Sequence, residues 1–97
     1  MRPVLHSDVT TAARALLAVP GSAREGLCAR LLREADWADR FTRRLGKPHP
    51  FWGNGTLLAA ARGHTLMPER SFDDRDYCSA FEMVLAQLLA RKDRGYL

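Results

Sequence analysis

Aromatic side chains gather in one short stretch, His49-Pro50-Phe51-Trp52, which lies in the longest irregular part of the chain. Aromatic residues often contribute most of the binding energy at the centre of a protein interface. We therefore expect His49, Phe51 and Trp52 to bind a partner if their rings stay exposed. The structural alternative is that the rings seal the end of a helical core, and we favour this for Trp52, with His49 and Phe51 the more exposed residues.

A second candidate site is basic, contains one aromatic residue and repeats at helical spacing. Its members are Arg30, Arg33, Trp37, Arg40 and Arg44. Arginines interleaved with an aromatic ring can follow a phosphate backbone, so this pattern indicates nucleic-acid binding. However, Asp36 precedes Arg40 by four residues and Asp39 precedes Arg43 likewise, a spacing that stabilises a solvated helix. We favour such a self-paired face, with nucleic acid or an acidic protein partner as the alternatives.

Residues that could catalyse a reaction or bind a metal do not form a recognisable motif. His6, His49 and His64 lie in separate segments, and the two cysteines are far apart. No serine or cysteine has the sequence context of a nucleophile. Residues 53–56 precede a helix but lack the lysine and the length of a phosphate-binding loop. We predict no catalytic residue, metal or cofactor, with a zinc site assembled from distant residues and a small enzyme as less favoured alternatives.

Composition indicates one small domain, residues 1–97, because 97 residues with 46% hydrophobic content support a single thin core. The formal net charge of +4 is modest for a dedicated DNA-binding protein. No apolar run reaches the roughly 18 residues that span a bilayer, and no signal peptide is recognisable, so we expect a soluble, cytoplasmic protein without membrane contact. Cys28 and Cys78 lie on the apolar faces of expected helices, which predicts two buried free thiols.

The strongest helix signal covers residues 23–45. Ser22 and Glu25 have the spacing of a capping box, which predicts Ser22 as the N-cap. Gly46 can close the helix in the left-handed conformation, and Pro48 prevents it from resuming. The apolar residues repeat with the helical period. They are Leu27, Cys28, Leu31, Leu32, Ala35, Ala38, Phe41 and Leu45.

A C-terminal helix is expected over residues 74–92. Asp73 is its predicted N-cap, and Phe72 can pack on Tyr77 as a hydrophobic staple. The expected buried stripe recurs at helical spacing. It consists of Tyr77, Phe81, Val84, Leu85, Leu88 and Leu89.

Two short helices complete the expected fold. The first, residues 8–18, begins after a cap at Ser7 or Asp8, and the second, residues 55–62, begins after a cap at Asn54. The predicted fold is an all-α, single-domain bundle of about four helices. We expect the long helices 23–45 and 74–92 to form its main packing pair.

Three segments resemble parts of short uncharacterised proteins from alphaproteobacteria of the Rhodobacter type. They are Arg2-Pro3-Val4-Leu5-His6, His49-Pro50-Phe51-Trp52-Gly53-Asn54-Gly55 and Asp76-Tyr77-Cys78. The resemblance implies a bacterial origin and a family without an established activity, and it contributes no catalytic residue.

The polar residues are mostly explained by helix caps and solvated faces, so we predict a non-enzymatic accessory or regulatory module that binds a protein partner or self-associates. Nucleic-acid binding through the basic face of helix 23–45 is the main alternative. A small enzyme is the less favoured third possibility.

Overall fold

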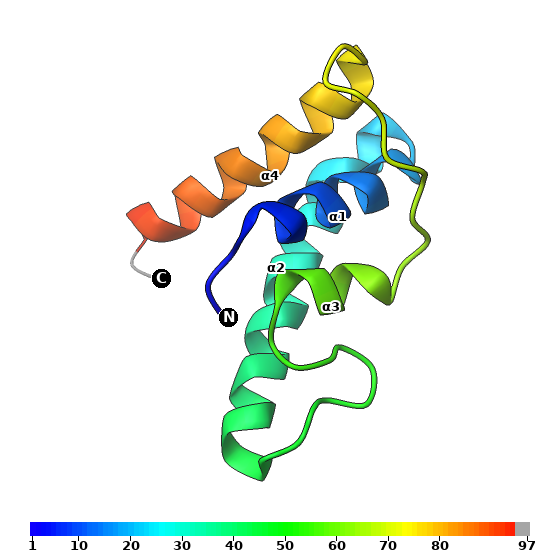
Figure 1. The fold of residues 1–97 in the computed structure, drawn as a ribbon. Coiled ribbons are helices and arrows are strands. Elements are labelled where there is room, and N and C mark those ends of the chain that lie inside the picture. Colours follow the sequence, from blue (N-terminus) through cyan, green and yellow to red (C-terminus); the bar gives the residue numbers. More distant parts are fainter. Residues whose placement is uncertain (95–97) are drawn as a thin grey trace.

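The computed structural model describes residues 1–94, and four helices joined by loops make up this part of the chain (Figure 1). They are α1 (His6–Leu17), α2 (Gly21–Leu45), α3 (Leu57–Arg62) and α4 (Arg75–Asp93). The described residues contain no strand, and an isolated antiparallel bridge joins His49 and Gly53. The predicted all-α bundle with two long and two short helices is confirmed. None of the helices described here is both long and apolar enough to cross a bilayer.

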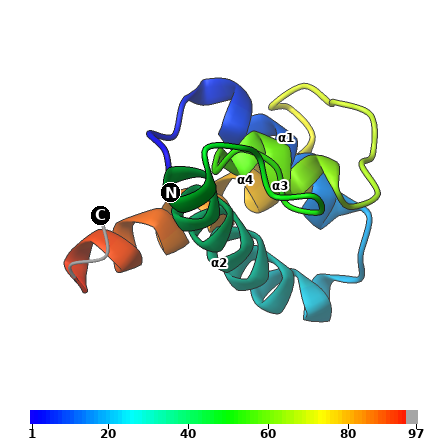
Figure 2. The same ribbon diagram turned by 90° about the horizontal axis from the view of Figure 1, so that it is seen from below.

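Helix α1 lies at the centre of the fold, with the other three helices packed against it (Figures 1 and 2). Its contacts with α4 and α3 are more extensive than the contacts between α2 and α4. The predicted pairing of helices 23–45 and 74–92 as the main packing pair is therefore wrong. Ala12, Ala13 and Ala15 are fully buried, and their small side chains allow other helices to approach α1 from several sides.

The long helix α2 begins before the predicted capping box. Its first residue is Gly21, and no side chain in the part of the chain that the structure describes caps its N-terminus. The Pro20 carbonyl accepts a hydrogen bond from the Ala23 amide at 2.9 Å, which places Ser22 inside the first turn. The prediction of Ser22 as the N-cap is therefore wrong, whereas Gly46 ends the helix in the predicted left-handed conformation, with φ 72°.

Asp8 has a different role from the predicted cap of α1. It lies in the first turn of the helix, which begins at His6. One carboxylate oxygen of Asp8 accepts from the Leu5 amide at 2.9 Å, and the other accepts from the Leu58 amide at 2.8 Å. This buried carboxylate therefore stabilises the start of α1 and joins it to α3.

The caps of α3 and α4 are each displaced from the predicted residue. Thr56 rather than Asn54 caps α3, while the Asn54 side chain accepts from the Thr56 amide and hydroxyl at 3.1 and 2.9 Å. Asp74 rather than Asp73 caps α4, accepting from the Tyr77 amide at 2.9 Å. In both cases several adjacent residues can accept a hydrogen bond, and the path of the loop selects one of them.

Two predicted core faces are only partly covered. On α4, Leu85 and Leu89 are 42% and 61% exposed, contrary to prediction, because the second half of this helix extends beyond α1 (Figure 1). On α2 the predicted face is buried from Cys28 to Ala38, but Leu27 and Phe41 are half-buried and Leu45 is exposed. Both long helices therefore leave apolar side chains at the surface.

The two cysteines differ in exposure. Cys28 is buried as predicted, whereas Cys78 is exposed, because it lies on the solvent side of α4. Burial raises the pKa of the Cys28 thiol to about 12, which disfavours its reactive thiolate.

We expect a thiol reagent at about pH 8 to modify Cys78 in the folded protein and Cys28 only after denaturation. Mass spectrometry of the labelled peptides checks this, and equal labelling rates would contradict it.

Candidate functional site

The structure brings the aromatic loop and the basic face of α2 together. The Trp52 ring of the loop contacts the Trp37 ring of α2, with centroids 5.6 Å apart. His49 stacks on Trp52 at 4.4 Å with an interplanar angle of 6°, and Phe41 contacts the His49 ring at 4.8 Å in an edge geometry. These four rings, Trp37, Phe41, His49 and Trp52, form one continuous aromatic cluster.

A tight turn positions the rings of the loop. The His49 amide donates to the Gly53 carbonyl at 2.8 Å, and the Gly53 amide donates back at 3.1 Å. The Nδ1 atom of His49 also accepts from the Phe51 and Trp52 amides at 3.1 and 3.2 Å. As a result Phe51 lies at the tip of the turn, with 77% of its surface exposed.

Two glycines allow this loop to lie against the helices. A Cβ atom at Gly53, where φ is 82°, would lie 2.5 Å from the Cβ atom of Ala59 on α3. A Cβ atom at Gly55, where φ is 101°, would lie 2.6 Å from the Cα atom of Asp39 on α2. Only glycine fits these positions without displacing a neighbour, so the glycines hold the loop beside α2.

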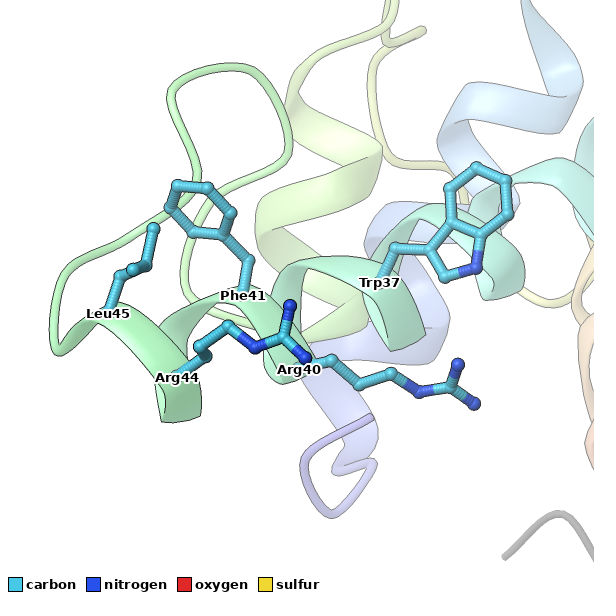
Figure 3. Close-up of a pocket in the computed structure, with 5 residues that line it drawn as sticks. All are labelled: Trp37, Arg40, Phe41, Arg44 and Leu45. Atoms are coloured by element: carbon cyan, nitrogen blue, oxygen red, sulfur yellow. The ribbon is translucent and has the colours of Figure 1, made fainter.

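Side chains of the second half of α2 line an open hollow of about 680 Å³ next to the aromatic cluster (Figure 3). Trp37, Phe41 and Leu45 project from one edge of this face of the helix, and the side chains of Arg40 and Arg44 run along the helix beside them. We call the aromatic cluster together with Arg40, Arg44, Leu45 and Phe51 the aromatic surface. It combines exposed apolar area with guanidinium groups.

Carboxylates of α2 neutralise part of its basic face. Arg40 pairs with Asp36 at 3.2 Å and Arg43 with Asp39 at 2.9 Å, which confirms the two ion pairs predicted from spacing. Arg30 pairs in the same way with Glu34 at 2.9 Å.

Asp36 remains a charged partner for Arg40. Burial raises the pKa of the Asp36 carboxyl, but a hydrogen bond from the Met1 amine and the charges of Arg40 and Arg91 outweigh burial and hold the pKa below its usual value.

Among the five predicted nucleic-acid-binding residues, Arg33 and Arg44 form no ion pair with any residue of the described chain.

Trp52 does not seal the end of the core as predicted. It is half-buried and lies outside the main hydrophobic core, because the turn folds the loop along the side of α2. Phe51 is exposed as predicted, whereas His49 is half-buried. Trp52 and Phe51 instead border a small hollow of about 200 Å³ that also contacts Glu34 and His64.

Glu34 and His64 form a pair that the sequence did not predict. The Glu34 side chain, in a residue only 5% exposed, lies 3.0 Å from the Nε2 atom of His64 and also accepts from Arg30. The residues are 30 apart in sequence, and no local spacing relates them.

This acid–histidine pair borders a hollow smaller than the 300 Å³ or so at which ligand pockets usually begin. The contact between Glu34 and His64 connects α2 to the segment after α3. No group of three or more His, Cys, Asp or Glu residues in the described chain is placed to hold a metal ion.

Comparison with known proteins identifies one family. The model of DUF7742, described as a domain of unknown function, matches residues 2–88. No curated protein and no solved structure matches the sequence. The match includes the whole aromatic surface, agrees with the expected resemblance to an uncharacterised family, and assigns no activity to any residue.

Proposed function

The chain belongs to the DUF7742 family, and from this premise we propose that it is a non-enzymatic accessory or regulatory module that binds a protein partner through the aromatic surface. The observation that carries the proposal is the convergence of exposed aromatic and arginine side chains around one open hollow. Tryptophan and arginine are enriched among the residues that dominate binding energy at protein interfaces. We place this module in the cytoplasm of a bacterium as part of the same proposal.

The aromatic surface suits a protein partner better than a nucleic acid. Proteins that bind single-stranded nucleic acid stack the bases on exposed faces of their aromatic side chains. Here one face of Trp52 is covered by His49, and the ring also contacts Trp37. The ion pairs of Arg30 and Arg40 further weaken the positive field that would attract phosphates.

We expect Phe51→Ala to remove most partner binding without unfolding the protein. Because Phe51 is largely exposed, the free energy of unfolding should change by less than about 1 kcal/mol. Loss of an interface anchor should weaken binding by about 2 kcal/mol or more, roughly 30-fold. The measurement is quantitative mass spectrometry of proteins that co-purify with the tagged chain from its native cell. Trp37→Ala, on the adjacent helix, should have a similar effect on binding.

Phe72→Ala is the matched control, because Phe72 is also an exposed aromatic residue but lies before α4 and outside the aromatic surface. A partner recovered equally by wild type and Phe51→Ala, or turnover of a metabolite without any partner, would overturn the proposal.

Nucleic-acid binding is the second candidate, and it is favoured because Arg33 and Arg44 form no ion pair within residues 1–94. It predicts salt-sensitive binding of an RNA or DNA oligonucleotide. Substitution of both arginines by alanine should reduce the salt slope by about one unit for each lost phosphate contact.

A further inference from the structure

A second open groove, of about 800 Å³, lies between residues 1–4 and the second half of α4. Figures 1 and 2 both show the start of the chain and the end of α4 close together. None of the described residues that line this groove belongs to the aromatic surface. It is therefore a separate candidate for binding.

The floor of the groove is apolar and follows one face of α4. Leu85 and Leu89, one helical turn apart, are the exposed leucines that were predicted to be buried. Leu88 lies buried beside them, and Val4 contributes from the N-terminal segment. Exposed leucines in consecutive turns of a helix are the surface that a second amphipathic helix usually covers.

The rim of the groove is positively charged. Arg2, Arg43 and Lys92 line it, and none of the lining residues within 1–94 is acidic. Arg43 pairs with Asp39, but Asp39 is almost fully buried and does not line the groove. A second copy of this chain docked symmetrically on the groove would bring the basic rim of one copy against the basic rim of the other, which costs free energy.

We propose that this groove binds an amphipathic helix of a partner protein, with aliphatic side chains on one face and carboxylates along its flanks. The aliphatic side chains would cover Leu85 and Leu89, and the carboxylates would meet Arg2, Arg43 and Lys92. A partner strand would have to pair with the extended N-terminal segment beside the groove. The Arg2 amide of that segment already donates to the Gly55 carbonyl at 2.9 Å, so a helix fits better than an added strand. The groove extends the proposed function by giving the module a second, chemically distinct docking surface.

The test uses a synthetic fluorescent peptide of about 18 residues, with leucines at helical spacing on one face and glutamates on its flanks. A matched peptide carries lysine in place of every glutamate. Fluorescence anisotropy with the full chain should show the acidic peptide binding at least about tenfold more tightly, and more weakly as salt rises.

Leu89→Asp should weaken binding of the acidic peptide by at least about tenfold. Ala86→Asp is the control: it adds the same charge at an exposed site on α4 outside the groove, and it should change affinity by less than about twofold. Circular dichroism establishes that both variants fold. Equal affinity for the two peptides, an equal effect of the two variants, or no detectable binding would overturn the proposal.

A concentration-dependent dimer that Leu89→Asp dissociates, seen by sedimentation, would overturn it in favour of a second copy. Phe51→Ala should leave peptide binding unchanged, so failure at the groove and failure at the aromatic surface can be distinguished.

Discussion

Gly55→Ala is expected to destabilise the fold by about 3 to 5 kcal/mol, because a side chain at this position has neither a relaxed backbone conformation nor room. The φ angle of Gly55 is 101°, which residues with a side chain rarely adopt. The new Cβ atom would lie 2.6 Å from both the Cα and Cβ atoms of Asp39 and 3.0 Å from its backbone nitrogen. Because these atoms belong to α2, the loop must move instead.

Urea unfolding followed by circular dichroism measures this effect, and tryptophan fluorescence reports the loss of contact between Trp37 and Trp52. Gly26→Ala is the matched control, since Gly26 lies exposed within α2 and a Cβ atom there meets no atom of the described residues within 4 Å. It should stabilise the protein by about 0.5 to 1 kcal/mol through helix propensity. If both variants have the same stability, the loop does not rest on α2 as described.

Asp8→Ala is expected to lower the free energy of unfolding by about 3 kcal/mol. The residue is 5% exposed, and its carboxylate accepts from the Leu5 and Leu58 amides at 2.9 and 2.8 Å. Hydrogen bonds to a charged group contribute about 1.5 to 3 kcal/mol each, and alanine leaves both amides without this acceptor. The substitution also removes a link between α1 and α3.

Two further variants isolate this effect in the same unfolding measurement. Asp8→Asn retains one acceptor oxygen and should cost about half as much as Asp8→Ala. Ser7→Ala, at an exposed neighbouring residue, should change stability by less than about 0.5 kcal/mol. An Asp8→Ala variant as stable as Ser7→Ala would show that the carboxylate does not join the two helices.

The helices themselves could be predicted from the sequence, because their causes are local. The apolar period of residues 27–38 identifies the buried face of α2, and Gly46 ends this helix as expected. The Asp36–Arg40 and Asp39–Arg43 pairs were predictable because residues four apart are neighbours on any helix. The first residue of each helix was less predictable. For α4, Asp73 and Asp74 are both suitable N-caps, and the path of the preceding loop selects Asp74.

The arrangement of the helices was decided by the tertiary structure. Helical periodicity identifies an apolar face but not which element covers it or over what length, so it could not show that Leu85 and Leu89 remain exposed or that α1 is central. The contact between Trp37 and Trp52 depends on a loop turned back along α2 and on close approaches at Gly53 and Gly55.

The pairing of Glu34 with His64 joins residues 30 apart in sequence. The sequence alone therefore determined the helices, their apolar faces and their neighbouring ion pairs, because these depend on residues within one or two turns. Both proposed binding surfaces depend on contacts between distant segments, and these exist only once the helices have packed around α1.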